Sequence, residues 1–508
     1  MDNGYLLGVD IGTYSSKGVL VTRDGAVVAS HVVEHTLSMP HPGWAEQDAD
    51  AVWWHDFVTI VRALLTKSGA PPQRILAIGT SAIGSCVLPI DADGRPLRPA
   101  ILYGIDTRAT AEIAALNAAL GEDTIFETGG SALSSQASGP KVLWIRNHEP
   151  EIYNHTRYFL TSQAYLVYRL TGKPSIDVYT AGGFAPMWDI EARRWIPERG
   201  TLVTPVERLP EVFWSCDVVS GVTAEAAAAT GLAPGTPVIA GTTDAAAEAV
   251  SGGLAQPGDM LVMFGSSIFF VLKTEHLRRS RAFWAANFLE PGTYAFLGGM
   301  STAGSLTRWF REQFGQPELA AEAAGGENAY AALAELAAHS RPGAGGLVAL
   351  PYFEGERTPI HDPDARGTLF GLTLRHTRAD VYRALLESVA YGIRHNIEVM
   401  AGEGVQAHRI LAVGGGARNR LWLQIVSDVA GIALEVPEQQ IGASYGDAFM
   451  AGVGIGAFHD LTEVAHWVKN GRRIVPADPS PPAYETGYAI YRELYTQTAD
   501  LMHRLAAI

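Results

Sequence analysis

Apolar runs near the start of the chain alternate with short polar turns, a pattern that predicts a β-meander. Residues 5–10 and 17–22 are apolar runs on either side of a Gly12-Thr13 turn. An Asp-Gly pair at positions 24–25, a strong hairpin signal, then leads into a third run over residues 26–33. The sequence therefore predicts that the chain opens with consecutive hairpin-connected strands.

Longer stretches with helical spacing follow the meander. They cover residues 49–66 and 107–119, with a strand-like run at 75–79 between them. Ala-rich segments at 224–230 and 319–339 are typical of surface helices. This mixture of short strands and helices predicts an α/β fold.

The pattern of the first hairpin returns after the middle of the chain. Pro and Gly become dense over residues 232–237, and the stretch 258–274 then repeats strand, Gly265-Ser266-Ser267 turn and strand. We place the domain boundary at this punctuation, with one domain over residues 1–236 and a second over 237–508. A similar hairpin opening each half predicts a duplicated architecture in which the two turns face each other across a cleft.

Composition and charge narrow the class of protein. The chain has 508 residues, 47% of them apolar and 18% charged, which is a globular composition with room for two large domains. Lys and Arg number 38 against 53 Asp and Glu, a net charge of −15, and no basic block stands out. Nucleic acids and anionic membranes need clustered cations, so neither is an expected partner.

The cysteines and the N-terminus indicate a reducing compartment. Cys86 and Cys216 are the only cysteines, too few for a disulfide framework or a thiol metal site. The chain opens on Asp2-Asn3 instead of a basic, then apolar, leader, and its apolar runs fall short of the roughly 20 residues that span a bilayer. We expect a cytoplasmic protein.

Two carboxylates stand where predicted strands end, one in each half. Asp10 ends the first strand, and Asp244 follows the apolar run 238–240 and a Gly-Thr-Thr turn. Such a pair suits a metal and a general base. The alternatives stay open: Asp244 as a helix N-cap, and Asp10 as a carboxylate bonded to nearby backbone N–H groups.

Glycines mark a third place for a ligand. The stretch "LAVGGGARNRLW" at 411–422 runs from a short strand through three glycines into an amphipathic helix, which favours close approach of a ligand over a plain turn. No G-x-x-x-x-G-K-[ST] motif is present, so a P-loop is excluded. The glycines at 452–456 lack the spacing and context of a dinucleotide motif and predict close helix packing.

Several motifs, in order along the chain, resemble the FGGY family of sugar kinases. The resemblance covers nearly the whole length and implies an α/β fold of two RNase H-like domains, the fold of hexokinase, actin and the heat-shock chaperone ATPases, flanking a cleft. It is carried by "GTLFGL" (367–372), Asp380-Val381, "ALLE" (384–387) and "SGPKVLW" (138–144), with Gln136 at a position that is usually small or apolar. "HPGWAEQDADAVWW" (41–54) and "GERTP" (355–359) are especially similar to xylulose kinases.

The resemblance implies a role for most of the residues singled out above. Asp244 matches the general base that takes the proton of a sugar hydroxyl as it attacks the γ-phosphate of ATP, and Asp10 matches the carboxylate that holds Mg²⁺. The glycine turns match the phosphate and adenosine contacts. The implied ATP-binding residues are Gly12, Thr13, Ser15, Lys17, Gly265, Ser266, Ser267, Gly414, Gly415, Gly416, Ala417 and Asn419.

Candidate sugar contacts come with structural alternatives. Asp106 and Arg108 align with a family segment that ends Asp-x-Arg, and a helix cap with an adjacent charge is a nearly equal interpretation. Trp44 suits a wall of the sugar site or the core. Ser85 and Asp244 complete the predicted substrate contacts.

The departures from the family pattern affect residues expected to contact the sugar more than residues expected to act in catalysis. Tyr14 replaces a small hydroxyl residue, Gly84-Ser85-Cys86 replaces a Met-His-Gly, and Ala245 replaces an Asn or Gln beside the base. Lost polar partners change discrimination among hydroxylated substrates strongly. These differences leave the kinase prediction intact and open the choice of sugar.

The leading prediction is an ATP- and Mg²⁺-dependent kinase of a small sugar, first a pentulose such as xylulose. A kinase of another polyol, tetritol or autoinducer-like sugar is the alternative within the class. A non-catalytic nucleotide-dependent sugar sensor is the alternative outside it. The expected partner is the small sugar or polyol itself, and the choice between monomer and homodimer stays open.

Overall fold

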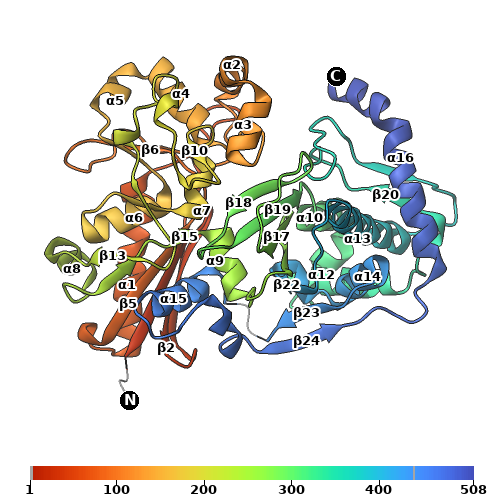
Figure 1. The fold of residues 1–508 in the computed structure, drawn as a ribbon. Coiled ribbons are helices and arrows are strands. Elements are labelled where there is room, and N and C mark those ends of the chain that lie inside the picture. The colour runs from red at the N-terminus through yellow and green to blue at the C-terminus, as the bar shows by residue number, and fades with distance from the viewer. Residues whose placement is uncertain (1–3, 439–440) are drawn as a thin grey trace. The chain divides into compact units, whose positions relative to one another are not determined.

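The computed structural model describes residues 4–438 and 441–508, and the contacts within it group these residues into two compact units (Figure 1). Unit 1 comprises the described residues up to Pro257, Lys273–Ala295 and Ile441–Val468. Unit 2 comprises Gly258–Leu272, the described residues from Phe296 to Glu438, and Lys469–Ile508. The predicted division at 236/237 stays a prediction; by contacts, residues 237–257 belong to unit 1.

The main sheet of unit 1 begins with the predicted meander. β1 (Tyr5–Ile11), β2 (Ser15–Thr22) and β3 (Val27–Glu34) are consecutive antiparallel strands. The sheet order is β13-β14-β5-β1-β2-β3, with β15 also paired to β5. β5 (Ile75–Ala82) runs parallel to β1, and β14 and β15 run parallel to β5. The remaining strands of this sheet are β13 (Val218–Gly221), β14 (Pro237–Ile239) and β15 (Thr242–Thr243).

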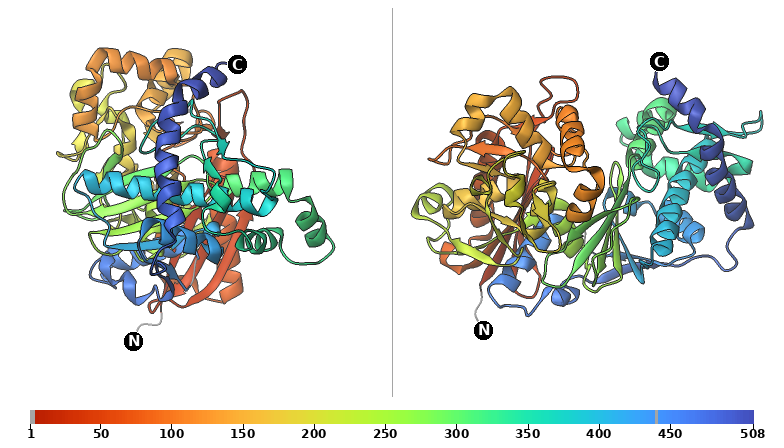
Figure 2. Two further views of the ribbon diagram at one scale, coloured as in Figure 1. Left: turned by 90° about the vertical axis from the view of Figure 1, so that its right-hand side faces the viewer. Right: turned by 45° about the horizontal axis from the view of Figure 1, so that its top comes forward.

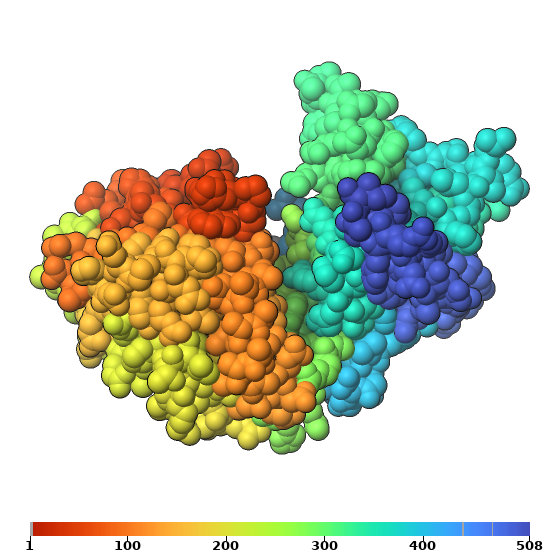
Figure 3. Space-filling model, turned by 90° about the horizontal axis from the view of Figure 1, so that it is seen from above, coloured from red at the N-terminus to blue at the C-terminus, as the bar shows by residue number. Residues whose placement is uncertain are grey.

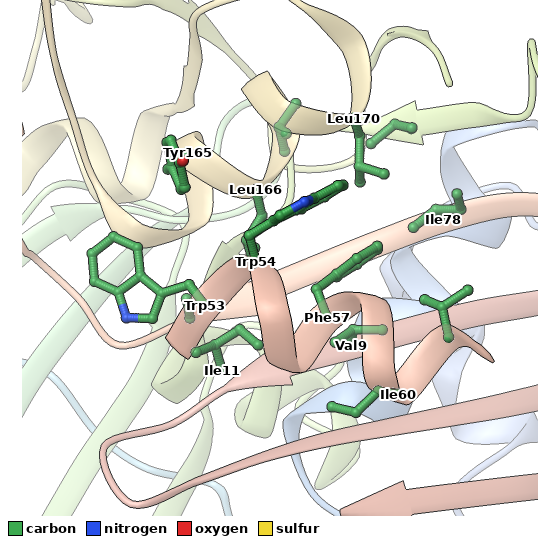
Figure 4. Close-up of a cluster of buried hydrophobic side chains, with 14 of the residues drawn as sticks. Val9, Ile11, Trp53, Trp54, Phe57, Ile60, Ile78, Tyr165, Leu166 and Leu170 are labelled. Atoms are coloured by element: carbon green, nitrogen blue, oxygen red, sulfur yellow. The ribbon is translucent and has the colours of Figure 1, made fainter. Parts of the chain in front are cut away.

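Helices cover both faces of this sheet. On one face the helix predicted over 49–66 begins with a π-helical turn, η1 (Ala49–Trp54), and continues as α1 (His55–Ser68). In Figure 4, Phe57 and Ile60 lie beside Val9 of β1, and Trp54 lies toward Leu166 and Leu170 of α6 (Ser162–Thr171), all in one apolar core. Strand alternation follows directly, because Val9 faces this core and its neighbour Gly8 faces the other side.

The opposite face receives α15 (Ala443–Gly454) at very short range. A Cβ on Gly8 would come within 1.8 Å of the Ser444 carbonyl oxygen, so only glycine permits this approach of helix and strand. Gly452 lies within α15, and a Cβ there would come within 2.5 Å of the Phe458 ring. Gly452 and Gly454 are thus closely packed, in line with the prediction, whereas a Cβ on Gly456 would meet nothing within 4 Å.

The rest of unit 1 is a set of helices and short strands around a second apolar cluster that includes Trp144, Phe184 and Trp188. The helices are α2 (Thr110–Leu120), α3 (Glu122–Gly129), α4 (Ser138–His148), α5 (Pro150–His155), α7 (Val178–Ala181), α8 (Ala224–Thr230) and α9 (Asp244–Ser251). The short strands are β4 (Glu46–Gln47), β6 (Leu88–Ile90), β7 (Ala100–Ile101), β8 (Tyr158–Leu160), β9 (Ser175–Asp177), β10 (Trp188–Asp189), β11 (Arg194–Trp195), β12 (Glu211–Phe213) and β18 (Trp284–Asn287).

Unit 2 is built on a second sheet with the order β19-β17-β16-β22-β23-β24. Its strands are β16 (Asp259–Phe264), β17 (Ile268–Thr274), β19 (Tyr294–Met300), β22 (Arg409–Val413), β23 (Leu434–Pro437) and β24 (Asn470–Ile474), beside a small sheet of β20 (Val348–Leu350) and β21 (Thr368–Phe370). β16 and β17 form the predicted antiparallel hairpin around the Gly265-Ser266-Ser267 turn. β22 then runs parallel to β16, so the strand before the predicted glycine turn lies beside this hairpin.

Long helices pack on the sheet of unit 2. They include α13 (Arg378–Gly402), α14 (Arg420–Ala430) and α16 (Pro482–Ala506). Figure 2 shows α16, in dark blue, on the outside of the unit, where it contacts α13, α14 and β20. α10 (Gly304–Phe314), α11 (Gln316–Ala323) and α12 (Ala329–Ala338) form a projecting lobe, green in Figure 3. Within the described ranges, no helix has the length and apolar character needed to cross a membrane.

Candidate active site

Parallel pairing in unit 1 brings the ends of three strands to one edge of the sheet. Asp10 on β1 is in register with Ser81 on β5, and Ser81 is in register with Thr242 on β15. Asp244 follows β15 directly as the first residue of α9, after Thr243 at the N-cap position. The N-cap alternative therefore applies to Thr243, and the Asp244 carboxylate accepts only from the N–H of Ala245 among the described residues, over 2.8 Å.

Burial shapes the acid–base chemistry of these carboxylates. It raises the pKa of Asp244 to about 6, against an ordinary value of 3.8. The pKa of Asp10 is raised well above its usual range by burial and by the charge of Asp244, and the Ser81 hydrogen bond opposes this rise. Lys17, which pairs with Asp10 across the hairpin, also favours the ionised carboxylate. The sequence missed Glu248, one helical turn after Asp244, whose pKa burial raises to about 7.

Ser81 links Asp10 to a second buried carboxyl group. Its hydroxyl lies 3.0 Å from Asp10 Oδ1 and 2.7 Å from Asp447 Oδ2. A hydroxyl carries one proton, so it donates to one carboxylate while the other must itself hold a proton. Burial and the charge of Asp10 raise the pKa of Asp447 well above its usual range, and burial raises the pKa of Asp10 likewise, so the two carboxyl groups and Ser81 share this proton. No sequence pattern pointed to Asp447, because it is 437 positions from Asp10 and comes near it through the packing of α15.

The first hairpin turn offers backbone donors. The Gly12 N–H bonds the Ser15 carbonyl over 3.0 Å, which closes the turn. Across the described chain, the N–H groups of Thr13 and Tyr14 donate to no protein acceptor. The Thr13 hydroxyl lies 3.0 Å from the Tyr103 hydroxyl, and the Tyr14 side chain is 64% exposed. Free donors in a glycine turn are what an anion such as a phosphate group needs.

The second turn, in unit 2, has the same construction. The Gly265 N–H bonds the Ser267 carbonyl over 3.0 Å, while Gly265 and Ser266 are exposed. The start of α10 supports this turn: the N–H groups of Ala303 and Ser305 both bond the Ser266 carbonyl, each over 2.9 Å. The N–H groups of Ser266 and Ser267 have no acceptor among the described residues. Each half of the chain thus supplies one glycine turn with unused donors.

A cavity of about 820 Å³ adjoins the second turn within unit 2. One face of α12, with Ala331, Ala334 and Ala338, forms an apolar wall. Gly265, Ser266, Gly415, Gly416 and Asn419 line other parts. Its volume and its mixture of apolar walls and backbone edges suit a nucleoside-sized ligand.

The three glycines after β22 serve different purposes at this cavity. Gly414 has φ of 91°, and a Cβ there would come within 2.7 Å of the Phe264 carbonyl oxygen. A Cβ on Gly415 would meet nothing within 4 Å, so this residue faces open space. Ala417 is buried, and the Asn419 side chain caps α14 by accepting from the Trp422 N–H over 3.0 Å. Gly414 and Ala417 are thus behind the lining that Gly415, Gly416 and Asn419 provide.

Asp106 and Arg108, predicted as sugar contacts, are turned toward each other. Neither side chain is exposed, and Arg108 bonds both oxygens of Asp106 and also Glu46. The Arg108 guanidinium lies 4.0 Å from the Trp44 ring centroid and 5.1 Å from that of Trp144. These contacts support a bracing role for Asp106, Arg108 and Trp44, and their contact with sugar stays a prediction.

Ser85 lies near the start of α9. A Cβ on the preceding Gly84 would come within 2.2 Å of Thr243 Cγ2, and one on Gly183 would come within 1.9 Å of Ser85 Oγ. The segment around Ser85 is therefore packed against the residue before Asp244. Contact of Ser85 with the sugar stays a prediction.

Lys141 of the "SGPK" motif binds backbone carbonyls beside the predicted sugar contacts. Its side chain is buried and donates to the carbonyls of Tyr103 and Ser135, over 3.0 and 2.6 Å. Burial lowers its pKa to about 8. The sequence reasoning missed Tyr103, which this lysine holds and whose hydroxyl reaches Thr13.

The fold and these turns define a two-domain kinase of the actin-like ATPase class, and comparison with known proteins identifies its family. Residues 5–251 match the N-terminal domain, and residues 260–455 the C-terminal domain, of the FGGY family of carbohydrate kinases. The chain belongs to this family and is a carbohydrate kinase, as predicted, and the family implies ATP as the phosphoryl donor.

Named relatives are similar over their full lengths. The chain is 30% identical over 501 residues to the xylulose kinase of Escherichia coli (strain K12), covering 98% of this chain and 99% of the relative. It is 28% identical over 515 residues to the gluconokinase of Bacillus subtilis (strain 168), covering 99% of each. The crystal structure of xylulose kinase from Rhodospirillum rubrum superposes with a TM-score of 0.90 at 32% identity, over 98% of this chain and all of that one.

Proposed function

We propose that this kinase transfers the γ-phosphate of ATP to a hydroxyl of a small sugar, first a pentulose such as xylulose, with Asp244 as general base. The observation that supports it most is the register of β1, β5 and β15, which sets Asp10, Ser81 and Asp244 at one sheet edge. Two named xylulose kinases at 30% and 32% identity favour the pentulose.

Asp244 has the properties that a general base requires. A pKa of about 6 keeps the carboxylate ionised at neutral pH, yet makes it a better proton acceptor than an exposed aspartate. In the proposal it takes the hydroxyl proton while the turn at Gly12 holds phosphate oxygens. The unit 2 cavity and the Gly265 turn bind the adenosine and phosphates of ATP.

The donor set fits Mg²⁺. Asp10 supplies a carboxylate oxygen at the edge of the sheet, although within the described residues no group of three or more acidic, His or Cys side chains is arranged to hold a metal by itself. Mg²⁺ commonly binds through one or two carboxylates together with phosphates and water. Asp10 would hold the ion, which would neutralise charge on the transferred phosphoryl group.

The sugar itself is the open choice within this proposal. Ser85 and Ala245 are small where the resemblance to xylulose kinases predicts larger polar groups, and one similar relative is named a gluconokinase. A kinase of another polyol, tetritol or related sugar is therefore the second candidate. The comparisons give no support to a non-catalytic sensor.

The test is Mg-ATP-dependent release of ADP across pentuloses, tetritols, glycerol and aldonic acids. Wild type is compared with Asp244→Asn and with the matched exposed control Asp93→Asn. We expect turnover with one or two sugars, a loss of about 10²–10⁴-fold in Asp244→Asn and none in Asp93→Asn. Turnover with a tetritol but no pentulose would select the second candidate. ATP binding without sugar-stimulated turnover would contradict the kinase mechanism.

A further inference from the structure

A buried His–Asp pair lies directly beneath the first glycine turn. His35 follows β3, and its Nδ1 lies 2.8 Å from Asp56 Oδ2 on α1. Its Nε2 lies 3.1 Å from the carbonyl oxygen of Gly12 in the turn. The two side chains are only 7% and 4% exposed.

The hydrogen-bond geometry fixes the protonation of this histidine. A carboxylate and a carbonyl oxygen only accept hydrogen bonds, so both ring nitrogens must donate. Neutral imidazole has one N–H and satisfies one of these partners, whereas imidazolium satisfies both. The Ser16 hydroxyl also donates to Asp56 Oδ2 over 2.7 Å, which leaves the carboxylate oriented toward the ring.

The surrounding charges agree with a charged ring. The charged group that faces His35 is Asp56 on α1, while the hairpin faces it with the carbonyls of Gly12 and Thr13 and with the Ser16 hydroxyl. Lys17 and Glu34 alternate away from Ser16 and His35 on their strands. Burial opposes the charge, but Asp56 and the two carbonyls prevail and raise the pKa of His35 above its ordinary 6.5.

We infer that protonated His35, held by Asp56, is a positioning residue that clamps the Gly12 carbonyl and so holds the N–H groups of Thr13 and Tyr14 ready for phosphate. This inference rests on the proposed function of the turn. The N–H of His35 also bonds the Tyr14 carbonyl over 3.0 Å, so one residue holds the turn at two points.

Deprotonation would release the clamp in a defined way. Asp56 retains the Nδ1 proton, because a carboxylate is the stronger acceptor. Nε2 would then present a lone pair to the Gly12 carbonyl, and the two acceptors would repel. The raised pKa sets the sign: the clamp is complete at mildly acidic pH and is lost as the pH rises through the titration of folded His35.

The experiment measures Mg-ATP affinity by calorimetry from about pH 6 to about pH 9, the range in which a histidine with a raised pKa titrates. The proteins are wild type, His35→Gln, Asp56→Asn and His31→Gln, a control on the same strand β3. We expect His35→Gln to weaken ATP binding about tenfold at pH 6, the effect of one charge-assisted hydrogen bond, and to remove the fall in affinity at high pH. The KM for sugar should stay unchanged, whereas the unfolding temperature should fall, because Asp56 loses its buried charged partner; affinities are therefore compared well below the unfolding temperature of each variant. Asp56→Asn should move the fall to lower pH, and His31→Gln should behave as wild type.

Two results would overturn the clamp: equal ATP affinity and pH dependence in wild type and His35→Gln, or an unshifted profile in Asp56→Asn. Nitrogen-15 shifts of wild-type His35 at neutral pH provide a readout that needs neither variants nor ATP. Two protonated ring nitrogens support the clamp, and a neutral ring contradicts it. If wild type binds no ATP, the proposed function fails while these shifts still decide the state of His35.

Discussion

Asp10 and Ser81 occupy paired positions on the parallel strands β1 and β5, and the Ser81 hydroxyl lies 3.0 Å from the Asp10 carboxylate. The same hydroxyl lies 2.7 Å from Asp447 on α15. One serine therefore connects the carboxylate proposed to hold Mg²⁺ with a carboxyl group that α15 brings against the back of the sheet.

Removing this hydroxyl should cost stability. We expect Ser81→Ala to destabilise the fold by about 1–3 kcal/mol, because two buried carboxyl groups lose their shared partner. It should also raise the pKa of Asp10 further, since the Ser81 hydrogen bond favours the ionised form. Calorimetric unfolding temperatures measure the first effect, with the exposed Ser30→Ala as control. Equal unfolding temperatures for both variants would show that the bridge contributes nothing.

Acidification should abolish turnover through Asp244. Its pKa is raised to about 6, so the base is ionised above that pH and protonated below it. We expect kcat/KM to fall with decreasing pH below about 6, by roughly tenfold per pH unit where one group titrates. The measurement is kcat/KM for the preferred sugar at saturating ATP, and Asp244→Asn should lack this acidic limb. A rate that stays constant down to about pH 4 would contradict the raised pKa.

A side chain added at Gly415 should impair ATP binding, whereas one added at the neighbouring Gly414 should reduce stability. Gly415→Leu places its side chain in open space at the unit 2 cavity, so we expect the KM for ATP to rise at least about tenfold while the unfolding temperature stays near wild type. Gly414→Ala meets the Phe264 carbonyl at φ of 91°, so we expect a loss of stability of about 1–3 kcal/mol. Kinetics and calorimetry on both variants provide the check. The reverse pattern would remove the cavity from the ATP site.

Arg108 provides a test between bracing and sugar contact. Breaking a buried ion pair on one side costs about 3–5 kcal/mol, so Arg108→Gln should lower the unfolding temperature sharply. Arg95→Gln is the control, because Arg95 forms an exposed ion pair with Asp93 on a loop of the same unit. Its replacement should leave the unfolding temperature unchanged. If Arg108→Gln instead keeps its unfolding temperature and raises the KM for sugar alone, Arg108 contacts the sugar.

Local sequence determined the elements that hold the site. Both glycine hairpins follow from apolar runs around short polar turns, and the strand–glycine–helix unit at 411–422 follows from the same pattern, because strand pairing across a tight turn depends on neighbouring residues. The helix over 49–66 was also predicted, although its first turn is π-helical. The motifs, taken in their order along the chain, were sufficient to predict the family.

Only the tertiary structure decided which side chains meet. Ser81 and Asp447 join Asp10 through strand register and the packing of α15, and no local pattern encodes contacts between residues so far apart in the sequence. Burial likewise decided that Arg108 pairs with Asp106 and stacks on Trp44, and that His35 lies between Asp56 and Gly12. A sequence records which groups can carry charge, but the desolvation and partners that set their protonation exist only once the chain is folded.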